Sequence, residues 1–442
     1  MKRIQMVLLT FVLVIGISSN VFALNADSPE EKEWSLSDLY QRALDFSEKI
    51  KIMEKELVIS EKDKERAFAV LVPRFTAYGS WGGYREQEID ISGSQWTWGA
   101  KFGQSFTLNG RELVAFGMAK DQIAKTAMDL SAVRESYLFQ VAAVYFDILK
   151  AMKRKEIAQA NVLRMETHKE AVLVQLKLEN VPKTELYRTE ATLSGYKTEL
   201  VISKNNVFLS RAVLMRLVNL PENFTIKVPK TFPEFMFERN LEELKQSALK
   251  KREDLKSLRM SLKISESNID LSKGAYWPTL SIQGGYEVVD ADPNIFTIYD
   301  QNLLFVGAEV SFPLYDGGLR SAELGQARVR SKQAELQVKD YSKQVSIEVE
   351  TAYRNLITVE SLITSVNDKL KSAQANYEAI TVQFQTGMAD SLEVIDANAL
   401  LADAERELIE ARYTLSLTFL ELQKARGTFL NDIKERYNLK MN

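Results

Sequence analysis

The sequence predicts an internally duplicated, mainly helical chain in which each copy also contributes two β-strands. The first observation is a repeat. Residues 382–408 match residues 174–200 at a constant offset of 208, with seven identities, where chance would give about one or two. The second observation is that helical periodicity changes to strand-like alternation at equivalent points of both copies. Although 442 residues would ordinarily suggest two or three domains, the repeat favours one fold built by duplication.

The composition excludes several functional classes. Charges are balanced, with 57 basic against 60 acidic residues, so nucleic acid is not an expected partner. Cysteine is absent, which excludes disulfides, thiolate metal sites, cysteine nucleophiles and a lipid anchor on an N-terminal cysteine. His168 is the only histidine, and we expect it at the surface or in a helix seam rather than in an active site. Nucleotide-binding and zinc-protease motifs are missing, so we expect neither an enzyme nor a cofactor.

The first 23 residues have the features of a secretory signal. Lys2 and Arg3 precede a short apolar core, and the stretch ends in the small residue Ala23, which suits cleavage. An N-terminal membrane anchor is the alternative, but the apolar run is short for a span. No later stretch is apolar enough for a transmembrane helix. We therefore expect a chain that leaves the cytoplasm and is either soluble or held in a membrane by strands.

Each copy opens with a helical segment that is followed by two alternating stretches. Residues 36–73 and 241–278 each carry one apolar helical stripe that ends at a proline. The apolar sides of the alternating stretches are Phe75, Ala77 and Trp81; Trp96, Trp98, Ala100, Phe102 and Phe106; Leu280, Ile282, Tyr286 and Val288; and Leu304, Val306, Ala308, Val310 and Phe312. Aromatic-rich alternation of this length is typical of transmembrane β-strands. An amphipathic hairpin packed on a soluble core would show the same pattern, and the residues alone do not decide between the two.

A long helical hairpin follows the strands in each copy. Helical periodicity runs from Gly110 to a break near Val181, a helix of about 100 Å at about 1.5 Å per residue. The hairpins turn at residues 180–182 and 386–388, because proline and glycine interrupt a helix. Both turns lie farthest from the strands, and we expect a partner to dock there. The expected docking residues are Val181, Pro182, Lys183, Thr184, Gly387, Met388, Ala389, Asp390 and Ser391.

Two carboxylates near the second turn are not explained by ordinary Glu–Lys pairing along a helix. Glu393 and Asp396 are spaced three apart, so they share one helical face beside the hairpin tip. Two interpretations stay open at this point. The pair is either a functional acidic site or a solvated pair that the helix N-terminus favours.

The order of elements resembles the TolC-like outer-membrane factor family over essentially the whole chain after the signal. The most specific stretch is residues 311–320, SFPLYDGGLR, which is similar to the family's passage from the last strand into the long helix. The next is residues 384–388, FQTGM, followed by residues 393–398, similar to the family's second hairpin tip. The first copy departs from the pattern. It has Thr107 in place of Pro313, and Pro182 in a tip that usually carries glycine.

The resemblance implies a homotrimer in which four strands per chain close one twelve-stranded β-barrel in outer-membrane lipid. Below the barrel the helices would form a tunnel through the periplasm. A shared barrel is consistent with backbone hydrogen bonding. Four strands cannot close into a barrel by themselves without exposing the unpaired backbone groups of their edges to lipid. The implied organisation is a signal peptide at 1–23, repeat 1 at 24–220, an equatorial segment at 221–240, repeat 2 at 241–426 and a C-terminal tail at 427–442. The equatorial segment and the tail would form a belt around the tunnel.

The alternation within the strands assigns a lipid-facing side to this barrel. The residues expected to face lipid are Trp96, Trp98, Phe102, Val306 and Val310.

The resemblance also implies a function as the exit channel of a tripartite efflux pump or of type I secretion. The channel would dock to a periplasmic adaptor (membrane fusion) protein and to an inner-membrane transporter of the RND or ABC type. The family has acidic rings at positions that match Glu393 and Asp396. Glu185 would add negative charge nearby, and Arg188 could pair with Asp396 across neighbouring helices. The alternative is a secreted periplasmic coiled-coil adaptor or scaffold whose strands never enter a membrane.

Overall fold

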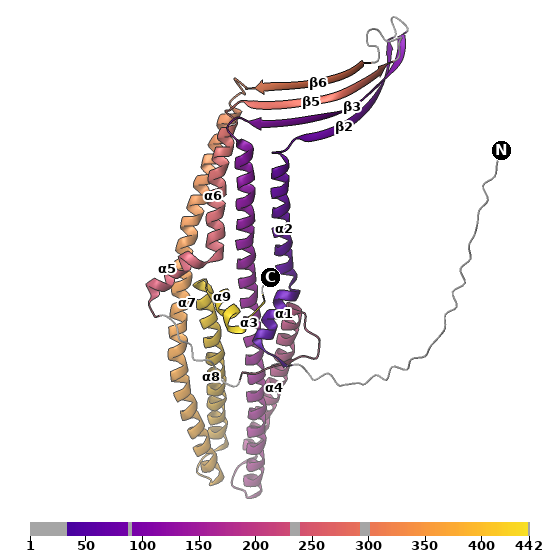
Figure 1. Ribbon diagram of the computed structural model, residues 1–442. Helices are drawn as coiled ribbons and strands as arrows, with labels where there is room; N and C mark the ends of the chain where they lie inside the picture. Colours follow the sequence, from indigo (N-terminus) through magenta and orange to yellow (C-terminus); the bar gives the residue numbers. More distant parts are fainter. Residues whose placement is uncertain (1–32, 87–90, 230–238, 292–300, 441–442) are drawn as a thin grey trace, which may run out of the picture.

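The chain is elongated, with a four-stranded sheet at one end and two helical hairpins that reach the other end (Figure 1). The computed structural model describes residues 33–86, 91–229, 239–291 and 301–440. The predicted signal peptide, residues 1–23, lies outside the described residues, as does the part of the predicted equatorial segment from 230 to 238.

The two long helices that the repeat predicts are equal in length. α3 and α7 each have 67 residues, which is about 100 Å of helix. Each begins directly after a glycine with a positive φ, Gly110 or Gly318. The helices are α1 (Leu36–Phe46), α2 (Glu48–Ala69), α3 (Arg111–Lys177), α4 (Lys183–Val218), α5 (Leu241–Lys251), α6 (Glu253–Gly274), α7 (Leu319–Gln385), α8 (Ser391–Ala425) and α9 (Phe429–Tyr437). Across the described residues, no helix combines the length and the apolar character needed to cross a membrane.

The four long strands form one antiparallel sheet in the order β2–β3–β5–β6. Their bounds are β2 (Arg74–Glu86), β3 (Ile91–Thr107), β5 (Thr279–Ala291) and β6 (Gln301–Ser311). The register pairs Phe75 with Phe102, Phe102 with Gly284 and Gly284 with Val306. Because side chains alternate along each strand, this register places the predicted apolar residues of all four strands on one face.

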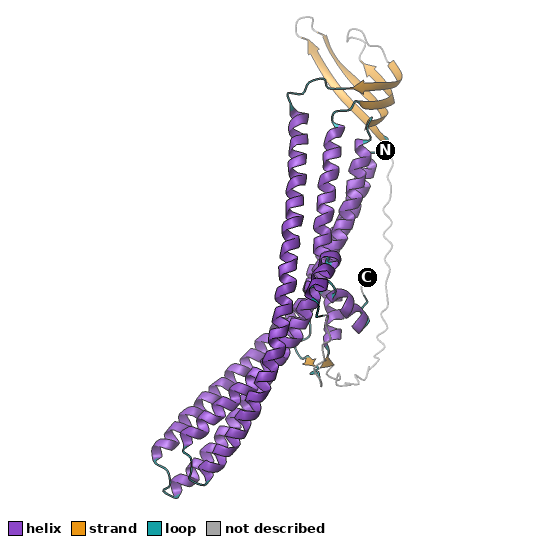
Figure 2. Cartoon of the chain, turned by 90° about the vertical axis from the view of Figure 1, so that its left-hand side faces the viewer, coloured by secondary structure: helices purple, strands orange, loops and turns teal. Residues whose placement is uncertain are grey.

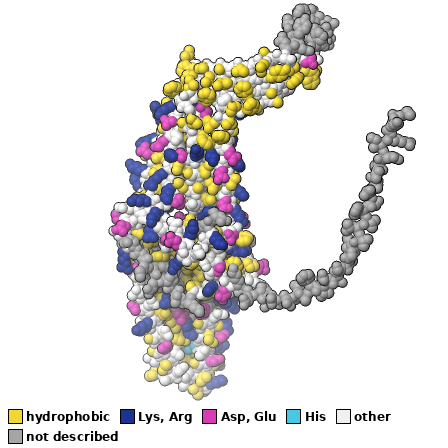
Figure 3. All heavy atoms as spheres, in the orientation of Figure 1, with side chains coloured by type: hydrophobic (Ala, Val, Ile, Leu, Met, Phe, Trp, Pro, Cys, Tyr) yellow, Lys and Arg dark blue, Asp and Glu magenta, His cyan; other side chains and the backbone are white. Residues whose placement is uncertain are grey.

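That apolar face is exposed. Trp96, Trp98, Val306 and Val310, all predicted to face lipid, are each more than half exposed. The fifth predicted residue, Phe102, lies on the same face between them. Figure 3 shows hydrophobic side chains covering the sheet, while charged side chains gather on the helices below it. A contiguous apolar face of this kind is unusual on a soluble monomer and marks a surface that another apolar phase covers.

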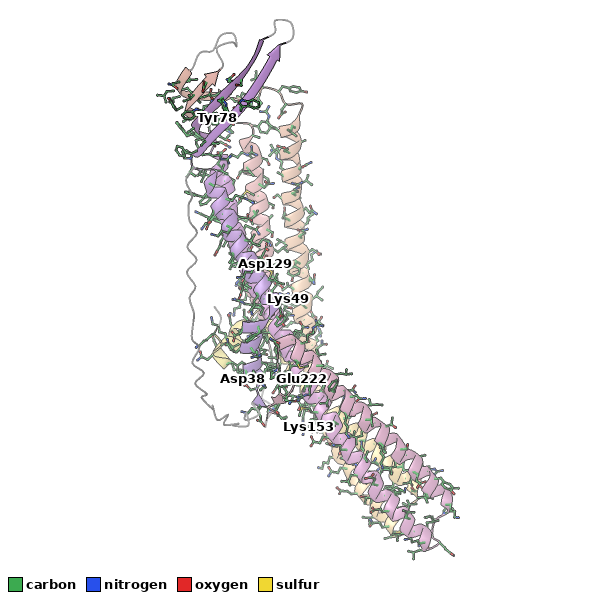
Figure 4. The ribbon with its side chains drawn as sticks, turned by 90° about the vertical axis from the view of Figure 1, so that its right-hand side faces the viewer. Asp38, Lys49, Tyr78, Asp129, Lys153 and Glu222 are labelled. Carbon is green, nitrogen blue, oxygen red and sulfur yellow. The ribbon has the colours of Figure 1, made fainter. Side chains whose placement is uncertain are left out.

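The opposite face of the sheet is polar. The Tyr78 hydroxyl (Figure 4) donates a hydrogen bond to the Glu287 carboxylate by reaching across Gly99 of the strand between them. Gly99 is needed there, because a Cβ would lie 2.4 Å from the backbone oxygen of Tyr286. The Lys101 ammonium lies 5.2 Å from the centroid of the Tyr78 ring. The two faces of the sheet therefore suit lipid on one side and water on the other.

Short elements form a belt around the helices about half-way along the molecule (Figures 1 and 2). They are α1, α9 and a parallel strand pair, β1 (Glu33–Trp34) with β4 (Thr225–Ile226). Tyr40 of α1 is fully buried, and its ring centroid lies 6.4 Å from that of Phe429 in α9. α9 belongs to the stretch 427–442, which the sequence analysis assigns to the C-terminal tail without predicting a helix. Its buried residues Phe429 and Ile433 are spaced four apart, and this spacing in the sequence is a pattern typical of a helix.

A network around Arg252 connects three long helices at the level of this belt. Arg252 lies between α5 and α6, and its guanidinium pairs with Asp254 at 2.7 Å and with Glu348 of α7. Gly427 follows α8 with a φ of 73° and packs closely against the backbone of Arg252. A Cβ at this position would lie 2.8 Å from the Arg252 backbone nitrogen. Burial, with the nearby Asp254 carboxylate, raises the pKa of Glu135 on α3 to about 7. Asp254 of α6, Glu348 of α7 and Gly427 at the end of α8 thus meet at one level, beside Glu135 of α3.

We expect arginine to be tolerated at Gly307 but not at its neighbour Val306. Val306 lies on the apolar face, where an arginine near the bilayer midplane costs about 2–4 kcal/mol. Gly307 lies on the polar face, and an added Cβ there meets no atom within 4 Å. The free energy of unfolding of Val306→Arg and Gly307→Arg in lipid bilayers, from denaturant titration, measures this difference. Equal destabilisation at the two positions would show that the strands are not in a membrane.

Candidate functional site at the hairpin tips

The two hairpin tips lie together at the end of the molecule farthest from the sheet (Figures 1 and 2). Both chain reversals use the same backbone hydrogen bond. The Asn180 N–H donates to the Gln175 carbonyl at 3.0 Å, and the Met388 N–H donates to the Gln383 carbonyl at 2.8 Å. These positions are related by the same offset of 208 as the surrounding helices, so the duplication extends to the turns.

Each turn contains one residue with left-handed backbone, and the two residues differ in kind. Gly387 has a φ of 77°, and the equivalent Glu179 has a φ of 61°. Glycine adopts this conformation freely, whereas a residue with a Cβ pays roughly 1–2 kcal/mol. The sequence identifies Gly387 as a turn residue but gives no local sign at Glu179. Only the alignment of the two copies could have indicated it.

Eight of the nine predicted docking residues are at least partly exposed, and the side chain of Met388 is 73% exposed. Ser391 is the exception, because it is fully buried between the two hairpins. Its assignment as a docking residue is therefore corrected: it belongs to the contact between the hairpins. The other eight remain predicted contacts for a partner.

A buried polar cluster joins the two hairpins just behind the tips. His168 of α3 lies with its Nε2 2.7 Å from the Ser391 hydroxyl, and the Thr189 hydroxyl of α4 lies 3.1 Å from the same oxygen. The His168 ring packs against Phe384 of α7, with 4.8 Å between the ring centroids. Burial lowers the pKa of His168 to about 4. The histidine is thus a neutral seam residue, consistent with one of the two places that the sequence suggests for it.

A second, charged link lies one turn farther from the tip. Arg164 of α3 donates from Nε to the Asn398 side-chain oxygen at 2.9 Å, and its terminal nitrogens donate to the Glu405 carboxylate at 2.8 and 3.1 Å. The Asn398 amide donates to the Tyr196 hydroxyl at 3.0 Å. Arg164 and Glu405 are both about three-quarters buried, which makes the pair stronger than an exposed surface bridge. Sequence reasoning missed Arg164 and Glu405, which are 241 residues apart.

The chain is similar to outer-membrane efflux proteins over most of its length. A family model described as Outer membrane efflux protein matches residues 244–428. Outer membrane protein TolC of Vibrio cholerae serotype O1 is 22% identical over 319 residues, which cover 71% of this chain and 73% of that protein. Outer membrane efflux protein BepC of Brucella suis biovar 1 is 21% identical over 316 residues, covering 71% and 68%. These matches support the interpretation of the chain as a TolC-like outer-membrane factor.

Solved channel structures share the fold of this outer-membrane factor. The Campylobacter jejuni CmeC outer membrane channel has a TM-score of 0.80 at 16% identity, covering 92% of this chain and 90% of that one. The outer membrane protein VceC from Vibrio cholerae has a TM-score of 0.76 at 17% identity, covering 89% and 96%. The outer-membrane factor accordingly lies in the outer membrane, with its helical hairpins in the periplasm.

The predicted gate acids of the outer-membrane factor lie at the start of α8. The Glu393 carboxylate accepts a hydrogen bond from the Asp390 N–H at 2.9 Å, and the Asp390 carboxylate accepts one from the Glu393 N–H at 2.9 Å. This reciprocal arrangement is a capping box, which stabilises the helix N-terminus. Asp396, nearly one turn later, is exposed. Glu393 therefore has the helix-terminal role, and both residues stay exposed beside the tip.

The matching residues of the first hairpin are arranged differently. Glu185 of α4 lies 3.9 Å from Arg188 of the same helix, and its side chain is only 15% exposed. Its Oε2 is buried with no hydrogen-bond partner among the described residues. Arg188 is about half exposed. The pairing of Arg188 with Asp396 stays a prediction.

We expect acid to loosen the contact between the hairpins through His168. Because its pKa is about 4 in the fold against 6.5 for a free histidine, the separated state binds the proton more readily. The stabilisation by neutral His168 is fully present above pH 6.5 and is lost as the pH falls toward 4. Amide hydrogen exchange of residues 384–394, corrected for intrinsic rates, should accelerate over this range in the natural protein. The variant His168→Gln should lack that component, and an identical pH profile in both proteins would contradict the assignment.

Proposed function

We propose that this outer-membrane factor is the exit channel of a tripartite efflux pump, which passes substrates from an inner-membrane transporter through a periplasmic tunnel to the outside. The main support is one combination of features. An exposed apolar sheet face lies at one end, and hairpins of 67-residue helices extend away from it. Efflux is favoured over type I secretion by the description of the family model and by the efflux protein among the relatives.

The edges of the sheet support an assembly of several chains, and the resemblance to outer-membrane factors sets the proposed number at three. β2 and β6 each pair on one side only within the described chain, so each leaves a row of unpaired backbone groups. Such groups cannot face lipid, and neighbouring chains therefore pair them. Four strands from each of three chains then close a twelve-stranded barrel. Large exposed apolar side chains on the outer helices also support contact between copies: Ile52 and Ile59 on α2, Phe208 on α4, and Val329 and Leu362 on α7.

The hairpin tips are the proposed docking surface for a periplasmic adaptor. They lie farthest from the membrane-facing sheet and combine the exposed Pro182 and Lys183 with the exposed Met388. An inner-membrane transporter of the RND or ABC type would supply the substrate on the far side of the adaptor. The hairpin tips are thus the end of the channel at which the adaptor and the transporter would connect to it.

The alternative, a secreted coiled-coil adaptor without a barrel, is opposed by the apolar face of the sheet, which would stand in water. Two measurements on the full chain, extracted in mild detergent, test the proposal. The mass should correspond to three chains, and the protein should conduct ions in a planar lipid bilayer. A monomer that is released by osmotic shock and does not conduct would contradict both the assembly and the channel.

Neutralising the acids at the tip should reduce cation selectivity. In a trimer, Glu393 and Asp396 would form two rings of carboxylates near the narrow end of the tunnel, and such rings raise the local cation concentration. Because Glu393 also caps α8, Asp396→Asn is the cleaner variant, and the double variant with Glu393→Gln should show the larger loss. The measurement is the reversal potential in a salt gradient. Asp368→Asn, at an exposed position on α7 away from the tip, is the matched control and should change nothing. An unchanged potential in the double variant would show that these acids do not line the constriction.

A further inference from the structure

Two helices of the second repeat meet end to end at the level of the belt. α6 begins directly after Arg252 and α8 ends at Ala425, and both helices pack against α3 and α7. Gly427, just beyond α8, packs against the Arg252 backbone. We call this meeting point the joint. It determines how α8, which runs down to the second hairpin tip, is attached to the half of the chain that carries the sheet.

A cleft of about 480 Å³ lies beside the joint, lined by α3, α7, the start of α6 and the end of α8. The charged residues in its lining are Glu135, Arg252, Asp254, Glu348, Glu421 and Lys424. Four carboxyl groups thus share the cleft with two cations. When all of them are ionised, the lining carries an excess of negative charge.

The guanidinium group in this cleft is already shared between two carboxylates. Arg252 pairs with Asp254 at 2.7 Å and also with Glu348 of α7. The Tyr341 hydroxyl donates a second hydrogen bond to the Asp254 carboxylate at 2.8 Å. Asp254 and Glu348 are therefore stabilised as anions.

Glu135 of α3 has no ion pair among the described residues, although Lys424 lines the same cleft. The Lys424 ammonium lies 4.7 Å from the centroid of the Phe139 ring, and the Glu421 side chain is exposed. The Glu135 carboxylate accepts a hydrogen bond from the Leu430 N–H in the first turn of α9. Within the described chain, α9 adds no charged side chain to the lining. Glu135 thus connects α3 directly to α9 across the joint.

The repeat shows that an acidic pair is not a general requirement of this packing. The offset of 208 relates Glu135 to Lys343, and the offset of 205 relates Asp254 to Lys49. Both lysines are exposed. Two carboxyl groups that face one cleft are therefore particular to the joint of the second repeat.

We propose that Glu135 makes the joint sensitive to pH near neutrality. With the carboxyl group protonated, α9 and the end of α8 stay packed on α3. With the carboxylate ionised, the joint loosens and exposes that charge to water. The proposal goes beyond the channel function, because it concerns a device inside one chain and adds a response to protons.

The direction of the response follows from where the charge is better solvated. Burial, together with the nearby Asp254 carboxylate, raises the pKa of Glu135 to about 7. Ionisation therefore costs more free energy in the closed joint than in the open one, where water solvates the group. The stabilisation of the closed joint is fully present below pH 4.5 and is lost as the pH rises to 7.

Amide hydrogen exchange of residues 426–434 measures the opening of the joint. The full chain is studied in mild detergent between pH 4.5 and pH 8.5, with correction for intrinsic rates. Opening should become more favourable by up to about 300-fold as the pH rises from 4.5 to 7, and should level off above pH 7. Exchange at residues 384–394 is an internal reference, because His168 should make the tips respond in the opposite direction.

Three variants test the role of the side chain. Glu135→Gln keeps the size of the group but cannot ionise, so exchange at the joint should stay slow at every pH. Asp254→Asn removes the facing carboxylate and frees Arg252 from one of its partners, so the rise should level off at a lower pH. Glu170→Gln, at an exposed position of the same helix near the tip, is the matched control and should keep the natural profile.

The outcomes separate this device from the channel. A flat profile at residues 426–434 in the natural protein, or the same profile in Glu135→Gln, overturns the proposal even where the protein is trimeric and conducts. If Glu135→Gln does not fold, the natural profile and the shift in Asp254→Asn decide the question. A protein that does not conduct but shows the expected profile overturns the channel and leaves the joint standing.

Discussion

The unpaired edges of the sheet are the constraint on which the rest of this architecture depends. A backbone N–H or C=O group without a partner costs several kcal/mol in lipid, and β2 and β6 each expose a row of them. One chain has too few strands to close around a lumen, so the sheet becomes a stable membrane element only when edges from different chains meet. The two-faced character of the sheet has the same origin, because a closed barrel separates lipid from water.

The same constraint continues into the helices. α2 leads directly into the edge strand β2, and α7 follows directly from the edge strand β6. The surfaces that carry the open strand edges therefore extend downward as helices with exposed aliphatic side chains, among them Val58 and Val329. Because the chain is duplicated, the same type of helix surface occurs in both repeats. It can serve for contacts inside a chain and for contacts between chains.

The features that depend on local periodicity could be predicted from the sequence. Pro73 and Pro278 end two helices at equivalent points, and the alternation beyond them correctly assigns one face to residues of four strands. The resemblance to a known family added two expectations: that strands from several chains close into one barrel, and that the helices extend from it into the periplasm.

The features that depend on contacts between distant segments could not be predicted. The bond between His168 and Ser391 joins residues 223 apart, and no local pattern shows that both are buried. Glu179 adopts a glycine-like backbone without any sign in its own residue type, because the geometry of the hairpin imposes it. Helical periodicity shows which side of a helix is apolar, but not which partner covers it.

The network at Arg252 and Gly427 lies far from the hairpin tips, and the long helix α3 spans the distance between them as a rigid rod. From Glu135, which lies beside this network, α3 continues without a break to Lys177, a distance of about 60 Å. A rigid arm of that length converts a rotation of about 4° at the belt into a displacement of about 4 Å at the tips, with the helix itself unbent. The belt would be the pivot of this rotation. A rotation of this size at the belt would leave the sheet in place and move the hairpin tips by about the width of one side chain.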